Sequence, residues 1–116
     1  MKLFVYGTLK EGFRLHYVLK DSKKLEGQRI INGFKLIPMP GYPAAVLDPD
    51  SSISGEVYEV TDEHVIKSLD IIEGAYNRTK VNDVFVYVLK EHNKKFSLPE
   101  WEEKILVENN VYSWIR

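Results

Sequence analysis

The chain of 116 residues contains no cysteine. Disulfide bonds, thiol nucleophiles and zinc sites built on thiolates are therefore excluded. Histidine is also scarce, and His16, His64 and His92 are scattered without the spacing of metal ligands, so no metal site is expected. A chain without cysteine fits the reducing cytoplasm, which is the location we expect for this protein.

A charge excess of one sign and long apolar runs are lacking too. The chain has 16 lysines and arginines and 17 acidic residues, which gives a net charge of −1. Nucleic-acid binding usually needs a clear excess of basic residues along one face, so no nucleic-acid partner is expected. No apolar stretch approaches a membrane span, and the apolar run after Met1 is too short for a secretory signal, so no membrane partner is expected either.

Two common catalytic signatures are missing. Gly7 is not followed by the further glycines or the lysine-serine pair of a phosphate-binding loop. Ser51, Ser52 and Ser54 lack the Gly-x-Ser-x-Gly context of a serine hydrolase. The composition, with 44% hydrophobic and 28% charged residues, is that of a folded globular protein, and the length predicts one domain over residues 1–116 with its own core.

The pattern of apolar residues predicts an α+β domain in which strands outnumber helices. Between residues 25 and 37, the pair Asn32-Gly33 indicates either a hairpin between two strands or a bulge within one long bent strand, and both remain open. Segments rich in proline, glycine and aspartate are expected to form a rigid loop at 38–43 and a turn at 48–52. Strands are expected at 3–6, 44–47, 53–60 and 79–89, the last of them central.

Three helical segments are also expected. A short one around 14–19 follows the first strand. A longer one begins at Thr61, a good N-cap residue, and ends where Gly74 adopts a left-handed conformation. Pro99 at a first helical position predicts the third, over 100–106, and the residues after it are expected to pack back on the body. The apolar stripe of the longer helix consists of Val65, Ile66, Leu69 and Ile72.

Two distant segments carry candidate chemistry. The first strand ends at Gly7-Thr8, and backbone N–H groups that point outward from such a loop can bind a carboxylate or a phosphate. The alternative is a tight turn without a ligand. Glu73 lies at the end of the longer helix, where the helix dipole and burial beside Tyr76 are expected to raise its pKa toward neutrality. A carboxyl tuned in this way can take and return a proton, whereas an exposed Glu73 before a glycine cap has no such role.

Four segments together resemble the γ-glutamylcyclotransferase-like family, in particular its short γ-glutamylamine cyclotransferase and AIG2-like branch. They are similar to that family in order and spacing and extend over about residues 3–89, which leaves the tail from about Lys90 outside the resemblance. The segments are Phe4-Val5-Tyr6-Gly7-Thr8-Leu9-Lys10, Gly41-Tyr42-Pro43-Ala44, Gly55-Glu56-Val57-Tyr58-Glu59-Val60 and Leu69-Asp70-Ile71-Ile72-Glu73-Gly74-Ala75-Tyr76-Asn77-Arg78.

The resemblance implies a small mixed β-barrel with a few flanking helices, a cavity at one end, and no metal or organic cofactor. It implies that the loop of Tyr6, Gly7, Thr8 and Leu9 binds the substrate and that Glu73 is the catalytic acid and base. Tyr76 and Arg78 match a further motif of the family and are expected to support the wall of the site.

The implied reaction suits a chain without a cysteine nucleophile. The α-amine of a γ-glutamyl amide attacks its own γ-carbonyl and forms 5-oxoproline, which releases an amine or amino acid. The reaction needs a base, an acid and rigid donors for the α-carboxylate and the oxyanion, and Glu73 and the backbone after Tyr6 can supply them. Two alternatives remain: a binding module that holds a small carboxylate-bearing metabolite without turnover, and a partner-binding protein that uses the aromatic C-terminal segment.

Overall fold

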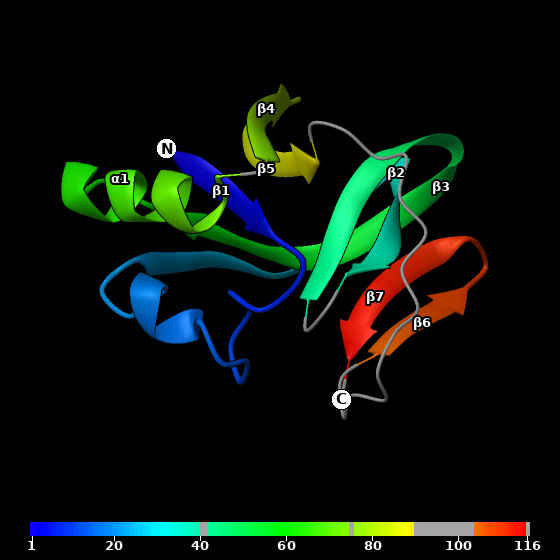
Figure 1. The fold of residues 1–116 in the computed structure, drawn as a ribbon, viewed down its shortest axis with the longest axis horizontal. Coiled ribbons are helices and arrows are strands. Elements are labelled where there is room, and N and C mark those ends of the chain that lie inside the picture. The colour runs from blue at the N-terminus through cyan, green and yellow to red at the C-terminus, as the bar shows by residue number, and fades with distance from the viewer. Residues whose placement is uncertain (40–41, 75, 90–103, 116) are drawn as a thin grey trace.

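The computed structural model describes residues 1–39, 42–74, 76–89 and 104–115. In these ranges the chain forms one α-helix, one 3-10 helix and seven strands, so the predicted α+β class in which strands outnumber helices is confirmed (Figure 1). The elements are β1 (Lys2–Val5), η1 (His16–Leu19), β2 (Lys23–Met39), β3 (Tyr42–Glu59), α1 (Glu63–Ile72), β4 (Tyr76–Val81), β5 (Val84–Leu89), β6 (Lys104–Glu108) and β7 (Val111–Ile115).

The long strand β3 organises the sheet. Its last residues pair antiparallel with β1, its middle pairs parallel with β7, and β2 accompanies it along most of its length. Ala45, near its start, pairs parallel with Val88 of β5, which also lies parallel to β1. A single bent strand therefore brings β1, β5 and β7 together, although they are far apart in the sequence (Figure 1).

The expected β-barrel is wrong, because the sheet is open. Its strands follow the order β4-β5-β1-β3-β7-β6, and in the residues that the structure describes no pairing joins β4 to β6. The bend of β3 curls the sheet around a core, but the two end strands stay apart. The flanking helical elements are α1 and η1, and each contributes a buried leucine, Leu69 or Leu19, to the cluster that contains Leu3 and Val5 of β1.

The bulge interpretation of Asn32-Gly33 is confirmed. The register between β2 and β3 shifts between Asn32 and Phe34, and Gly33 has a φ of 91°, which glycine adopts without strain. The rigid loop predicted at 38–43 is wrong at its ends, where β2 and β3 pair up to Pro38 with Pro43 and Met39 with Tyr42, and residues 40–41 lie outside the described residues. The strand β3 also continues through the turn predicted at 48–52.

Two further predictions are corrected by the strand pairing. The single strand expected at 79–89 is a hairpin of β4 and β5, because Asn82 adopts a left-handed φ of 54° and turns the chain. The helix expected at 100–106 falls partly outside the described residues, and its residues 104–106 belong to β6, which pairs with β7. Trp114 of β7 is buried in the core, as expected of the C-terminal segment.

The strand β1 lies between two apolar clusters. Phe4 faces a cluster that contains Val57 and Trp114, whereas Leu3 and Val5 face a second cluster that contains Leu69 of α1. Alternation along a strand produces this division, and it fixes both faces of β1. The carboxyl end of β1 is therefore a rigid base for the loop that follows it.

The N-cap of α1 is Asp62 rather than the predicted Thr61, because the Asp62 carboxylate accepts a hydrogen bond from the His64 N–H at 2.8 Å. Of the predicted apolar stripe, Leu69 is fully buried and Ile72 is 42% exposed. None of the helices in the described ranges has the length and apolar content needed to cross a membrane.

Candidate active site

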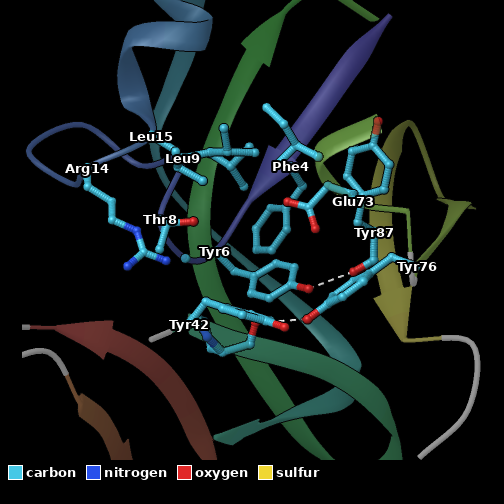
Figure 2. A pocket seen from close by; sticks show the side chains of 14 residues that line it. Phe4, Tyr6, Thr8, Leu9, Arg14, Leu15, Tyr42, Glu73, Tyr76 and Tyr87 are labelled. Atoms are coloured by element: carbon cyan, nitrogen blue, oxygen red, sulfur yellow. Dashed lines mark hydrogen bonds between the residues drawn. The ribbon is translucent and has the colours of Figure 1, made fainter. Parts of the chain in front are cut away.

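A cavity of about 280 Å³ opens at the carboxyl end of β1. The loop after β1, the start of β3, the end of α1 and the β4–β5 hairpin contribute its walls (Figure 2). All five residues predicted for the site line this cavity, namely Tyr6, Gly7, Thr8, Leu9 and Glu73. The fold thus brings together two segments that are more than 60 positions apart in the sequence.

Close packing against the β2–β3 hairpin shapes the loop that follows β1. A Cβ atom on Gly7 would lie 2.8 Å from Cγ of Pro43, so only glycine fits here without a shift. Carbonyls of the loop are held by local hydrogen bonds: Gly7 accepts from the Lys10 N–H and Thr8 from the Leu15 N–H, each at 3.0 Å. The loop is therefore tightly folded.

The backbone N–H groups of Thr8 and Leu9 have no acceptor among the residues that the structure describes. Both residues are buried at the cavity wall, where an unpaired donor is costly unless a ligand or water meets it. These two N–H groups are therefore available to an anion. The short helical segment predicted around 14–19 is confirmed as the 3-10 helix η1, and turns separate it from Gly7.

Polar contacts tie the loop to the sheet from outside the cavity. One carboxylate oxygen of Glu56 on β3 accepts hydrogen bonds from the Glu11 N–H and from the Tyr58 hydroxyl, each at 2.9 Å. The Lys10 ammonium donates to the Trp114 carbonyl of β7 at 2.7 Å. These contacts limit the movement of the loop, so the unpaired N–H groups are held in place.

Tyr6 uses its hydroxyl for structure. The hydroxyl donates to the Tyr87 carbonyl at 2.7 Å (Figure 2). It also accepts from the Ala45 N–H at 3.1 Å, and so joins the strands β3 and β5. Burial, followed by the neighbouring Tyr76, holds the pKa of Tyr6 well above its usual range. Tyr6 therefore stays neutral and presents its ring, not a titrating group, to the cavity.

Glu73 is the C-cap of α1, and its side chain points into the cavity (Figure 2). Its own N–H donates to the Leu69 carbonyl and its carbonyl accepts from the Tyr76 N–H, each at 2.8 Å. The predicted left-handed Gly74 is wrong, since Gly74 has no positive φ and the backbone turns at Glu73 instead. Burial raises the pKa of the Glu73 carboxyl to about 7, which agrees with the direction expected from the sequence.

The sequence did not reveal every residue that lines the cavity, and it indicated only a supporting role for others. Tyr76 is a wall residue as expected, and burial, followed by the charge of Glu73, raises its pKa. Arg78 does not line the cavity but pairs with Asp70 at 3.3 Å, and Asp70 accepts a hydrogen bond from the hydroxyl of the lining residue Tyr87. Tyr42 and Arg14 also line the cavity, although the sequence assigned no role to either of them. Tyr42 belongs to one of the four family-like segments, and Arg14 belongs to the segment predicted to be helical. No local pattern singles out either of these two side chains.

Comparisons with known proteins agree with this fold. A family model described as "Gamma-glutamyl cyclotransferase, AIG2-like" matches residues 3–104. A protein of Vibrio cholerae named "Putative gamma-glutamylcyclotransferase" is 34% identical over 103 residues, which cover 83% of this chain and 88% of that protein. A crystal structure of an uncharacterized protein from Pyrococcus horikoshii has a TM-score of 0.68 at 29% identity and covers 81% of each chain.

A second curated relative has a more specific name. The "Gamma-L-glutamyl-butirosin B gamma-glutamyl cyclotransferase" of Niallia circulans is 34% identical over 83 residues, which cover 72% of this chain. The match extends over 52% of that relative. The fold and the match over most of the chain define a protein of the cyclotransferase class. This chain belongs to the AIG2-like γ-glutamyl cyclotransferase family.

Proposed function

We propose that this protein is a γ-glutamyl cyclotransferase that converts a γ-glutamyl amine or γ-glutamyl amino acid to 5-oxoproline and a free amine or amino acid. One observation carries the proposal: the partly buried carboxyl of Glu73, whose pKa is raised to about 7, shares a cavity with the unpaired N–H groups of Thr8 and Leu9. Membership of the family and the names of the two curated relatives support the same reaction class.

The reaction makes and breaks one carbon–nitrogen bond. The ionised Glu73 carboxylate removes a proton from the α-ammonium of the substrate, and the free amine attacks the γ-carbonyl carbon to close a five-membered ring. The tetrahedral intermediate collapses as the bond to the leaving nitrogen breaks and protonated Glu73 returns a proton to that nitrogen. Two protons in total move from the α-nitrogen to the leaving nitrogen, one at a time. A carboxyl with a pKa near neutrality suits both directions of transfer.

Positioning contributes as much as the proton transfer. A general acid–base typically contributes about 10²–10⁴-fold, and holding a flexible chain in an attack geometry contributes further orders of magnitude. In this cavity the N–H groups of Thr8 and Leu9 hold the α-carboxylate, while the locked ring of Tyr6 forms the wall against which the substrate folds. Both anchors belong to the rigid end of β1.

The variant Glu73→Gln tests the proposal with a panel of γ-glutamyl amino acids and γ-glutamyl amines, assayed for 5-oxoproline. We expect the wild-type rate to rise with pH through about 7, because the ionised carboxylate is the starting base. Glu73→Gln should lose activity while it retains ligand-induced thermal stabilisation. The control is Glu63→Gln, an exposed residue of the same helix outside the cavity, which should keep wild-type activity.

Two results would contradict the proposal. Full activity of Glu73→Gln would remove its assigned role in proton transfer. Stabilisation of the wild-type protein by the panel without any 5-oxoproline would instead indicate a binding module that uses the same cavity.

A further inference from the structure

Arg14 is a cation of the cavity that the reaction above does not use. It lines the same cavity as Glu73, and the two side chains lie on opposite sides of it, with the Tyr6 ring between them and Arg14 beside Thr8 (Figure 2). The Arg14 side chain is exposed, whereas Thr8 is buried. Arg14 therefore lies at the rim of the cavity.

The charge of Arg14 has no partner in the part of the chain that the structure describes. The other two described arginines are both engaged: Arg29 pairs with Glu26 and Asp83, and Arg78 pairs with Asp70. No carboxylate, carbonyl or aromatic ring within those ranges holds the guanidinium of Arg14. A guanidinium presents a planar set of donors that matches a carboxylate, so an anionic group of a ligand is the partner that fits it.

The position of Arg14 at the rim indicates which anionic group of the substrate it meets. If the proposed function holds, the α-amine approaches Glu73 and the α-carboxylate meets the buried N–H groups of Thr8 and Leu9, so the glutamyl head is in the deep part. In the five-membered ring that forms, the attacking nitrogen is flanked by two carbons. One of them carries the α-carboxylate and the other carries the leaving nitrogen, so these two groups point away from each other. The leaving group then extends toward the rim, where Arg14 lies.

We infer that Arg14 binds a carboxylate on the leaving group, so that the enzyme favours γ-glutamyl amino acids over γ-glutamyl amines that lack a carboxylate. This inference rests on the proposed function and specifies its substrate class. Because Arg14 is exposed, the gain is that of a partly solvated ion pair, and we expect a preference of about tenfold in kcat/KM. The preference should shrink at high salt, since screening weakens exposed pairs.

Two matched substrates test the inference: γ-glutamyl-alanine, and γ-glutamyl-ethylamide, which lacks only the carboxylate of the leaving group. The wild-type protein should favour γ-glutamyl-alanine about tenfold, and Arg14→Gln should reduce the ratio to about one while it leaves the ethylamide rate unchanged. Arg14→Lys should restore part of the ratio, because it keeps the charge without the planar fork. The control Lys20→Gln removes one positive charge from the exposed end of η1, outside the cavity, and should keep the full ratio.

An equal loss of both rates in Arg14→Gln would overturn the inference, because it would place Arg14 against the glutamyl head that the two substrates share. Equal wild-type rates for the two substrates would overturn it as well and would leave the proposed function intact. If neither these two substrates nor any member of the panel gives 5-oxoproline, the proposed function fails, and titration of both compounds into Glu73→Gln and into Glu73→Gln/Arg14→Gln still decides the role of Arg14. A binding preference for γ-glutamyl-alanine that requires Arg14 supports the inference, and equal binding refutes it.

Discussion

Replacement of Glu73 by glutamine should stabilise the protein at neutral and alkaline pH, although it should abolish turnover. Burial raises the pKa of this carboxyl from 4.5 to about 7, so the folded state resists its ionisation. Each unit of pKa corresponds to about 1.4 kcal/mol, and the rise corresponds to about 2 to 3 kcal/mol, since the open cavity leaves the carboxyl partly hydrated. Glutamine has nearly the same shape and carries no charge, so it avoids this penalty.

The sign of the pH dependence follows from the direction of the pKa change. The folded state binds the proton more tightly than the unfolded chain, so the favourable contribution of protonated Glu73 is complete below about pH 4.5. It is lost as the pH rises to about 7, and the free energy of unfolding contributed by this group then stays constant. The difference in stability between Glu73→Gln and the wild type should therefore be near zero in acid and reach its full value above neutrality.

Urea unfolding of both proteins near pH 4.5 and near pH 8 measures this difference, because all other groups titrate alike in the two chains. The control Glu63→Gln removes an exposed carboxylate from the first turn of the same helix, where its charge favours the helix, and so it should not stabilise the protein at any pH. A Glu73→Gln protein that is no more stable than the wild type at pH 8 would refute the reasoning, since the carboxyl would then not be strained by burial.

Two further substitutions probe how the loop and wall of the cavity are held. Gly7→Ala should lower the free energy of unfolding by about 1 to 3 kcal/mol and lower kcat/KM, because its new methyl group overlaps Pro43. In the control Gly27→Ala the methyl group meets nothing within 4 Å, so stability and activity should not change. Equal effects of the two substitutions in urea unfolding and in 5-oxoproline assays would contradict the close packing at Gly7. Tyr6→Phe should lower the free energy of unfolding by about 1 to 3 kcal/mol, because it leaves the Ala45 N–H and the Tyr87 carbonyl without their partner. A urea midpoint equal to that of the wild type would show that the hydroxyl is dispensable.

Local sequence patterns predicted the elements whose signals are local. The strand before Gly7, the helix that ends at Glu73 and the glycine irregularity in β2 all follow from neighbouring residues. The correct choice between a hairpin and a bulge at Gly33 was not available from the sequence, because it depends on how β2 continues to pair with β3 beyond the bulge. Local signals thus identify an element but do not identify its partner.

The wrong predictions concern segments whose structure depends on distant partners. Residues 104–106 have the pattern of a short helix, but pairing with β7 makes them a strand, and β7 in turn needs β3. The hairpin at Asn82 had a usable signal in the Asn-Asp pair, which tolerates the left-handed turn, but the near-continuous apolar run concealed it. The openness of the sheet is a property of its two end strands together, and no single segment encodes it.

The candidate site was more predictable than the sheet, because its loop and its acid each lie in a recognisable segment. The wall residues Tyr42 and Tyr87 lie in strands that read as ordinary apolar or turn sequence, and only the fold brings them to the cavity. Arg14 lacked any signal except its proximity in sequence to Gly7. A charged residue near a functional loop becomes informative only once the structure shows that it has no ion-pair partner in the described part of the chain.

The helix α1 explains why the acid is buried at all. Leu69 and Glu73 are four residues apart, so they lie on the same face of the helix, one turn from each other. Leu69 is fully buried in the cluster that contains Leu3 and Val5 of β1, and this packing fixes the rotation of the helix about its axis. The rotation that buries Leu69 also turns Glu73 toward the carboxyl end of β1, where the loop with the unpaired N–H groups lines the cavity. The apolar packing of Leu69, together with that of Val65 and Ile66 against the same cluster, therefore sets both the position of the carboxyl and the burial that raises its pKa.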